Sequence, residues 1–168
     1  MPSLTSDELD AFLAEPGHLL RIATVDADGM PSVVPIWFIA EDGRLWFTPR
    51  ERSAWWTHLQ RDPRACVVVD EEATPYRKLV VRGSVRVDHA PGEDDAWRDR
   101  YRRIACRYIP DAAADAYITT TINERRALLS IPISGSGESS TWRMPVRGED
   151  GRGIWAERYY QATPRPGT

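Results

Sequence analysis

The residues best suited to chemistry lie in one short stretch, 45–56, whose composition changes from strand-like to loop-like to helix-like. Arg50 and Arg52 lie in its middle, and Ser53 follows at a position suited to the start of a helix. Guanidinium groups donate paired hydrogen bonds to phosphate, and a helix N-terminus adds unpaired N–H groups and a positive dipole. The stretch therefore predicts a phosphate-binding site.

Large aromatic residues in the same stretch leave two interpretations open. They could stack on a planar ring bound beside the phosphate. They could equally belong to the hydrophobic core or to a subunit interface, with the two arginines held in salt bridges. Spacing alone does not decide between these interpretations, which concern Trp46, Phe47, Trp55 and Trp56.

The sequence lacks the other common catalytic motifs. No glycine-rich phosphate loop follows a strand, no serine lies in a nucleophile elbow, and no pair of residues has metal-ligand spacing. The histidines are scattered, at His18, His58 and His89, and are expected at the surface or in satisfied hydrogen bonds. We therefore expect no metal ion and no dedicated acid–base pair.

Alternating apolar residues and turn signals predict the elements that position these groups. Thr5 and Glu8 have capping-box spacing ahead of a first helix, and Asp26–Gly29 reads as a hairpin turn. Gly83 interrupts the longest strand and predicts a bulge or bend there. The expected strands are 19–25, 31–40, 44–48, 65–69, 76–87, 127–133 and 139–144. Further helices are expected at 53–60, 92–108 and 111–119. Strands in meander order with peripheral helices predict a mainly β fold, a small closed or split β-barrel.

Composition limits the class of protein. The chain has 168 residues, of which 42% are hydrophobic and 28% charged, as in a soluble globular domain. We expect one domain, 1–168, with a core of about 5–145 and a C-terminal tail of about 146–168. A net charge of −3 without a basic block argues against nucleic acid, and no apolar run approaches a membrane span. The two cysteines and the absence of a signal-like N-terminus favour the cytoplasm.

Several segments, taken in order, resemble the pyridoxamine 5'-phosphate oxidase-like split β-barrel family. The likeness is closest to its flavin- and deazaflavin-dependent oxidoreductase branch and covers about residues 5–133. The segments that carry it are Leu20–Val25, Asp28–Pro31, Val34–Trp37, Leu45–Thr48, His58–Arg64, Val80–Val85 and Arg126–Pro132.

The resemblance implies a homodimer with the cofactor, deazaflavin F-420 or FMN, in the cleft between subunits. The cofactor ring would lie along the strand Val34, Pro35, Ile36 and Trp37, although Pro35 has no N–H to donate. The ribityl and phosphate groups would contact Phe47, Thr48, Pro49, Arg50, Arg52 and Ser53. Lys78 occupies the place of a flavin-contacting glutamine and would tune the ring, while Tyr76 and Trp142 would line the substrate side.

The sequence departs from the family pattern directly after Ser53. Members commonly continue with a basic pair that grips the phosphate, but here Ala54 and Trp55 follow. Arg50 and Arg52 could replace the pair, the phosphate could be held loosely, or the protein could bind no flavin.

The resemblance, together with the phosphate-binding pattern, implies an oxidoreductase that transfers hydride between a flavin-type cofactor and a small molecule. The alternative is a non-catalytic carrier or sensor of a flavin or haem on the same barrel, with His18, His58 or His89 as the axial ligand. A second alternative is pyridoxamine-phosphate oxidation itself, although Lys78 and the missing basic pair depart from that pattern.

Overall fold

The computed structural model describes residues 2–134 and 138–145, so most of the expected loop 134–137 and the expected tail 146–168 lie outside the described residues. The helices are α1 (Ser6–Ala14), α2 (Ala54–Arg61), α3 (Arg98–Cys106) and α4 (Asp111–Thr120), with a short 3₁₀ helix η1 (Asp94–Trp97) before α3. The strands are β1 (Leu20–Val25), β2 (Pro31–Ile36), β3 (Phe38–Glu41), β4 (Arg44–Phe47), β5 (Arg64–Asp70), β6 (Lys78–Ser84), β7 (Arg86–His89), β8 (Leu128–Pro132) and β9 (Glu138–Trp142).

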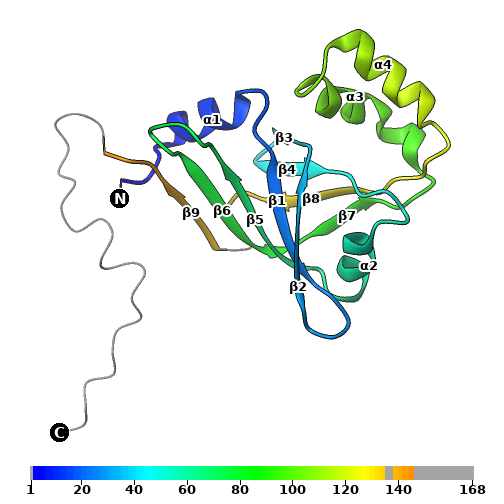
Figure 1. Ribbon diagram of the computed structural model, residues 1–168, viewed down its shortest axis with the longest axis horizontal. Coiled ribbons are helices and arrows are strands. Elements are labelled where there is room, and N and C mark those ends of the chain that lie inside the picture. Colours follow the sequence, from blue (N-terminus) through cyan, green and yellow to red (C-terminus); the bar gives the residue numbers. More distant parts are fainter. Residues whose placement is uncertain (1, 135–137, 146–168) are drawn as a thin grey trace, which may run out of the picture.

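The described strands form two antiparallel sheets (Figure 1). The first has the order β2-β1-β5-β6-β9 and the second the order β3-β4-β8-β7. The chain passes from one sheet to the other at Trp37, between β2 and β3, and at Val85, between β6 and β7. The prediction of a mainly β fold with peripheral helices is therefore confirmed.

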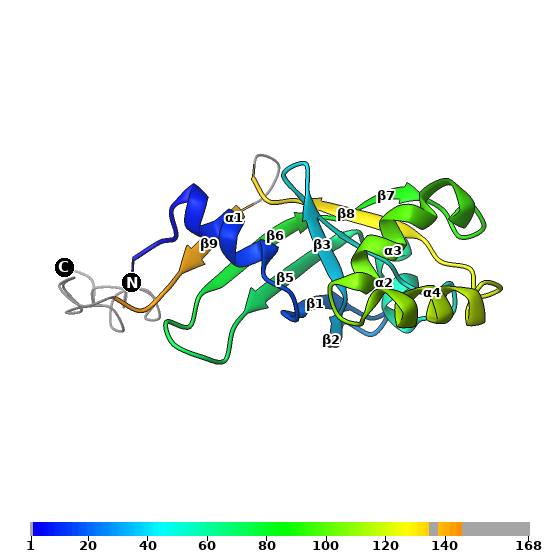
Figure 2. The ribbon, with the colours of Figure 1, turned by 90° about the horizontal axis from the view of Figure 1, so that it is seen from above.

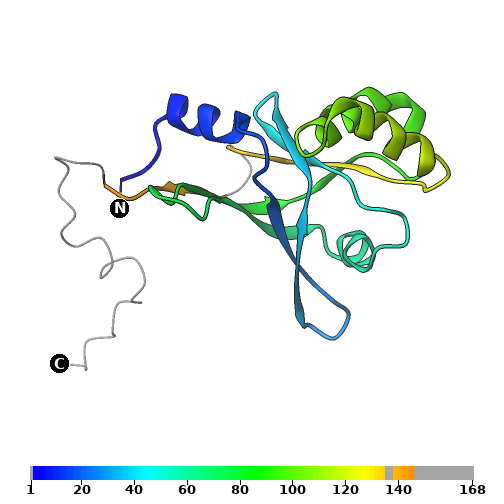
Figure 3. The ribbon, with the colours of Figure 1, turned by 45° about the horizontal axis from the view of Figure 1, so that its top comes forward.

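The main hydrophobic core contains apolar side chains from both sheets and from α1 and α2. Its largest fully buried members include Phe12, Phe38 and Phe47. Helices α3 and α4 lie side by side at one end of the molecule (Figures 2 and 3). A second cluster forms there from Trp46, Trp97, Tyr101, Ile118 and Leu128.

The predicted strand 31–40 is wrong in its continuity, because it breaks at Trp37. Residues 31–36 pair with β1 in the first sheet, and residues 38–41 pair with β4 in the second. A nearly all-apolar run indicates that both faces are covered, but it does not show where the chain changes sheets.

The predicted strand 76–87 is also two strands. It begins at Lys78 and breaks at Val85, two residues beyond the glycine expected to bend it. The Val85 amide donates to the Pro63 carbonyl at 2.8 Å. Alternation along 76–87 predicts Val87 on the same face as Leu79 and Val81, but Val87 is 50% exposed because β7 belongs to the other sheet.

The helix predictions differ from the structure mainly at helix starts. The capping box of α1 is confirmed, with the Glu8 amide bonded to the Thr5 side chain and the Glu8 carboxylate bonded to the Thr5 amide. The expected helix 92–108 begins as η1 and continues as α3, in which Tyr101 and Ile104 are buried. No helix among the described residues is long and apolar enough to cross a membrane.

Candidate functional site

The loop between β4 and α2 is fixed by the segment that precedes β8. Arg50 and Arg126 form an isolated antiparallel bridge. The Glu51 amide donates to the Arg125 carbonyl at 2.9 Å, and the Ala127 amide donates to the Pro49 carbonyl at 3.2 Å. The loop predicted to hold phosphate is therefore one wall of a groove whose other wall comes from residues 123–125.

Ser53 precedes α2 as expected, but its side chain does not cap the helix. The Ser53 hydroxyl instead donates to the Arg50 carbonyl at 2.7 Å, which closes a tight turn. Within the described part of the chain, the Ala54 and Trp55 amides have no hydrogen-bond acceptor, and the first turn of α2 holds no acidic residue. The start of α2 therefore keeps two unpaired N–H donors, the kind of group that can bind an anion.

The cations beside this helix start differ in their partners. The Arg50 Nε lies 2.8 Å from a Glu124 carboxylate oxygen, and its Nη2 donates to the Tyr117 hydroxyl at 3.3 Å. The hydrogen bond to Tyr117 is the main cause that raises the pKa of Arg50 above its ordinary value. Arg52 is exposed and forms no ion pair with any described residue. The groove has a volume of about 570 Å³ and is lined by Arg50, Glu51, Arg52, Asn123, Glu124 and Arg125.

The aromatic residues around the loop are part of the protein interior. Trp55 and Trp56 are 8% and 5% exposed, Trp46 is 6% exposed, and Phe47 is fully buried. Phe47 and Trp55 pack against each other, with their ring centroids 6.2 Å apart. The interpretation of these aromatics as core residues is therefore confirmed, and their rings are not available to stack on a ligand.

Strand β2 is an edge strand, and its free edge has an unusual set of backbone groups. The Asp26 amide donates to the Met30 carbonyl across the hairpin at 2.9 Å. Hydrogen-bonded and non-hydrogen-bonded residue pairs alternate along an antiparallel ladder. Counting from the Asp26–Met30 pair, the register therefore places the hydrogen bonds to β1 on Ser32, Val34 and Ile36 of β2. The backbones of Pro31, Val33 and Pro35 then face outward. Proline has no N–H, so Val33 is the N–H donor that β2 keeps on this edge.

Trp37 lies at the end of this edge and is held by two tyrosines. Its ring stacks on Tyr108, with centroids 5.1 Å apart and an interplanar angle of 3°. The Tyr117 ring meets it edge-on, with centroids 5.7 Å apart. The Trp37 side chain is therefore packed within the subunit, which fixes the point where β2 ends and β3 begins.

Tyr117 links the two stretches to which the resemblance assigned the cofactor. Its ring contacts Trp37, and its hydroxyl accepts hydrogen bonds from Arg50 at 3.3 Å and from Arg126 at 3.2 Å. Burial acts to raise the pKa of Tyr117, but its hydrogen bonds and the positive charges of Arg126 and Arg50 outweigh burial and lower that pKa. No local motif marks Tyr117, Arg126 or Val33 as a site residue, so the sequence alone did not predict them.

The remaining predicted site residues form a second group. Lys78 and Trp142 are register partners in β6 and β9, with the Lys78 Nζ 5.2 Å from the centroid of the Trp142 indole. Tyr76 is 48% exposed and has a φ of 55°, which is uncommon for a bulky residue. The loop between β5 and β6 lies at the opposite end of the molecule from the loop between β4 and α2 (Figures 1 and 3). One subunit therefore does not bring Tyr76, Lys78 and Trp142 to Arg50 and Ser53.

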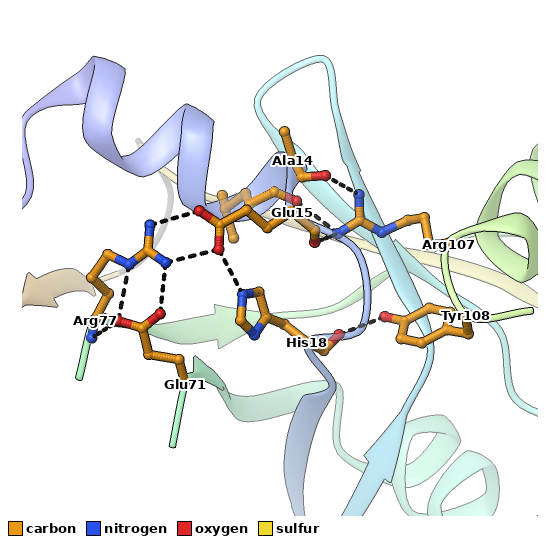
Figure 4. Close-up of polar contacts among 8 residues, drawn as sticks. Ala14, Glu15, His18, Glu71, Arg77, Arg107 and Tyr108 are labelled. Carbon is orange, nitrogen blue, oxygen red and sulfur yellow. Dashed lines mark hydrogen bonds and ion pairs between the residues drawn. The ribbon is translucent and has the colours of Figure 1, made fainter. Parts of the chain in front are cut away.

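An ion-pair cluster holds the loop that carries Tyr76, and we call its four members, Glu15, His18, Glu71 and Arg77, the Arg77 clasp. The Arg77 guanidinium donates to Glu15 at 2.8 Å and to Glu71 at 2.6 and 2.9 Å (Figure 4). The His18 Nε2 lies 3.1 Å from the Glu15 carboxylate. The clasp ties the end of α1 to the loop between β5 and β6.

Arg107 and Tyr108, the two residues that directly follow α3, also contact the end of α1 and the segment after it. The Arg107 guanidinium donates to the carbonyls of Leu13, Ala14 and Glu15, which lie at the C-terminal end of α1 (Figure 4). The Tyr108 hydroxyl donates to the His18 carbonyl at 2.8 Å. A cation at a helix C-terminus is favourable because the last carbonyls carry partial negative charge.

Glu15, His18 and Glu71 could in principle hold a metal ion, because their ligand atoms lie within 4.8 Å of one another. The Arg77 guanidinium, however, already donates to both carboxylates. A cation at the same place would meet that positive charge at short range. We therefore interpret the cluster as a structural ion-pair network.

The clasp predicts that acid destabilises the protein. Hydrogen bonds from Arg77 and then from His18 lower the pKa of Glu15 from 4.5 to about 2. A carboxylate with a depressed folded-state pKa contributes stability above its unfolded pKa and loses it as the pH falls through the folded one. Urea unfolding of the wild type should therefore show stability falling between about pH 4.5 and pH 2. The Glu15→Gln variant should be less stable than the wild type at pH 7, and its free energy of unfolding should fall less between pH 4.5 and pH 2. An equal fall in the variant and the wild type would contradict the prediction.

The three histidines lie apart and each has a polar neighbour. His18 contacts Glu15, as described above. The His58 Nδ1 lies 2.9 Å from the Thr24 hydroxyl, and the His89 Nδ1 lies 3.3 Å from a Glu93 carboxylate oxygen. None of them lines the groove at Arg50.

Comparison with known proteins places these observations in a family. The family model described as "Pyridoxamine 5'-phosphate oxidase" matches residues 5–129. A search of curated proteins finds no significant match.

Solved structures share the fold. The conserved hypothetical protein Rv2991 from Mycobacterium tuberculosis is 18% identical, covers 89% of this chain and 95% of its own, and has a TM-score of 0.64. The FAD and Heme binding protein from Mycobacterium smegmatis is 23% identical over 88% of this chain and 75% of its own, with a TM-score of 0.64. A structure described as F420 Reductase is 25% identical over 75% of this chain and 93% of its own, with a TM-score of 0.55. The predicted split β-barrel is confirmed.

Proposed function

The chain belongs to the pyridoxamine 5'-phosphate oxidase family, and on that premise we propose that it binds a phosphate-bearing, flavin-type cofactor and uses it in redox chemistry on a small molecule. The observation that carries the proposal is the start of α2. There, the Ala54 and Trp55 amides have no acceptor among the described residues. The loop directly before them places Arg50 and the unpaired Arg52 along a groove. Forked donors beside a helix N-terminus are the chemistry that a phosphate monoester or diester requires.

Deazaflavin F-420 is the cofactor we propose, with FMN as the alternative. The likeness to the structure described as F420 Reductase supports the deazaflavin. Both cofactors carry a phosphate on a ribityl chain, so both suit the same donors. When bound, either would supply a ring that accepts or donates hydride.

The chain's own residues would bind and orient this cofactor. Arg50, Arg52 and the first amides of α2 would hold the phosphate, with Thr48 and Pro49 bordering the ribityl chain. The edge of β2 would run along the ring, where Val33 is the available N–H donor. Trp37 would fix the end of that edge through its contacts with Tyr108 and Tyr117. We propose that this positioning is the protein's main contribution to the reaction.

A second copy of the chain would complete the site. Tyr76, Lys78 and Trp142 lie at the far end of the subunit from Arg50, so they can serve the same ring only if the partner supplies them. The hairpin of β1 and β2 exposes apolar side chains suited to such an interface, with Val25, Met30 and Val33 at 42%, 64% and 61% exposure. Scattered exposed apolar residues are normal, but three on one hairpin favour a contact surface. The free thiols of Cys66 and Cys106 suit a cytoplasmic dimer.

A carrier or sensor is the second candidate function. No histidine lines the groove, and two of its arginines, Arg50 and Arg125, pair with Glu124 and Glu51, an arrangement that serves binding without any acid–base step. The similarity to the FAD and Heme binding protein supports this alternative. A carrier would bind the cofactor and show no turnover.

Parallel titrations with FMN and deazaflavin F-420, followed by absorption and fluorescence, test the proposal. We expect saturable binding of at least one cofactor, with one molecule bound per chain and a dimer by sedimentation. Riboflavin, which has no phosphate, should bind far more weakly. Binding of neither cofactor would contradict the proposed function, and binding to a monomer would contradict the shared site.

A further inference from the structure

Arg50 has two contacts within the subunit that a phosphate ligand would have to share or replace. Its Nε lies 2.8 Å from Oε2 of Glu124, and its Nη2 donates to the Tyr117 hydroxyl at 3.3 Å. One of the two cations assigned to the phosphate is therefore already paired with a carboxylate. Arg52, by contrast, has no such partner among the described residues.

Glu124 lies beside two guanidinium groups that differ in their exposure to solvent. The same carboxylate oxygen lies 3.6 Å from Nη2 of Arg126, whose side chain is only 7% exposed. Arg126 is held by the Tyr117 hydroxyl, and its amide donates to Asp94 at 2.8 Å. The side chains of Glu124 and Arg50 are 44% and 52% exposed, so both have room to change partners.

We propose that Glu124 is an internal competitor for the cofactor phosphate: it occupies Arg50 until the phosphate replaces it, and it thereby sets the affinity of the groove. This inference rests on the proposed function. A phosphate monoester carries more negative charge than a carboxylate and has three terminal acceptor oxygens, so the exchange favours it. A diester matches the carboxylate in charge and in its two terminal oxygens, so it gains less from the exchange. No covalent bond changes, and Glu124 keeps Arg126 as its partner.

Tyr117 is the positioning residue for this exchange. Its hydroxyl accepts from both Arg50 and Arg126, and its ring is packed against Trp37. When Glu124 releases Arg50, the hydrogen bond to Tyr117 keeps the guanidinium at the groove. An exposed arginine without that bond would lose side-chain entropy on binding phosphate.

A neighbouring ion pair provides a matched comparison in the same groove. Glu51 pairs with Arg125 at 3.3 Å, and Arg125 also donates to the Pro91 carbonyl at 2.6 Å. Removing the Glu51 charge changes the net charge of the groove as much as removing that of Glu124, but it does not free Arg50. A competitor and a general charge effect therefore predict different results.

The experiment titrates FMN and riboflavin into the wild type, Glu124→Gln and Glu51→Gln. If the wild type binds only the deazaflavin, then deazaflavin F-420 replaces FMN and its phosphate-free chromophore replaces riboflavin. E124Q should bind the phosphate-bearing cofactor about fivefold more tightly, since an exposed ion pair accounts for up to about that factor. Its affinity for the phosphate-free compound should not change. E51Q should gain less than about twofold, and Glu124→Asp should return the affinity toward that of the wild type.

The outcomes separate the competitor role from the proposed function. If the wild type binds the cofactor but E124Q binds it equally or more weakly, the competitor role is overturned and the proposed function stands. Equal gains in E124Q and E51Q also overturn it, because they indicate a general charge effect. If the wild type binds neither cofactor, both inferences fail. Thermal melting of each variant shows whether a loss of affinity reflects a loss of folding.

Discussion

Replacing both Arg50 and Arg52 with alanine is expected to weaken binding of the phosphate-bearing cofactor by about a hundredfold or more. A hydrogen bond to a charged group contributes about 1.5–3 kcal/mol, and two guanidinium groups are lost together. The phosphate would keep only the first amides of α2 as donors. Fluorescence titration of FMN or the deazaflavin measures the change, and riboflavin, which has no phosphate to lose, should bind the variant and the wild type alike.

The single variants should not be equal. Arg52 has no ion-pair partner among the described residues, so its full contribution appears on binding. Arg50 must first leave Glu124, from which it lies 2.8 Å, so part of its contribution is offset. Arg52→Ala should therefore weaken binding more than Arg50→Ala. Arg64→Ala is a suitable control, because Arg64 is 81% exposed and its one ion pair within the described ranges is with Asp62. An unchanged affinity in the double variant would contradict the phosphate assignment.

The sequence predicted one wall of this groove and not the other. Two arginines, a serine and a helix start lie within a few residues, so their chemistry is visible as a local pattern. The opposite wall, from Asn123 to Arg125, reaches the loop through backbone pairing of residues 49–51 with residues 125–127, which includes the bridge between Arg50 and Arg126. The hydroxyl of Tyr117 reaches it through the Arg50 side chain. Contacts between segments so far apart in the sequence follow from sheet topology, which no local pattern contains.

The strands show the same difference: their positions follow from the local sequence, but their neighbours in the sheets do not. Alternation and turn residues predicted nearly every strand, but the breaks at Trp37 and Val85 were missed. At both points the chain leaves one sheet and its pairing partner changes. Side-chain periodicity reports which face is buried, and it does not report which strand is the neighbour. Ser53 is a related case, since its hydroxyl bonds to a carbonyl where the residue type predicted a cap.

Arg77→Ala is expected to lower the free energy of unfolding at pH 7 by about 3 kcal/mol, the low end of the cost of breaking a buried ion pair. Arg77 serves two carboxylates, and the Glu71 side chain is only 8% exposed. Without the guanidinium, Glu71 keeps a negative charge in a place where water cannot fully solvate it. Glu15 is 43% exposed and adds less, because solvent screens it. Urea unfolding at pH 7 measures the loss.

The pH dependence of that loss distinguishes an electrostatic clasp from simple loss of packing. Arg77 lowers the pKa of both Glu15 and Glu71, so its stabilisation is present above their ordinary pKa of 4.5 and disappears as the pH falls. The difference between the wild type and Arg77→Ala should therefore shrink between about pH 4.5 and pH 2. A second substitution, Glu71→Gln, should recover part of the stability lost at pH 7, because it removes the unpaired charge. Arg64→Ala, which breaks a pair of similar distance at the surface, should cost less than about 1 kcal/mol. Equal costs for the two arginines, or a cost for Arg77 that does not vary with pH, would show that the clasp holds the β5–β6 loop by packing alone.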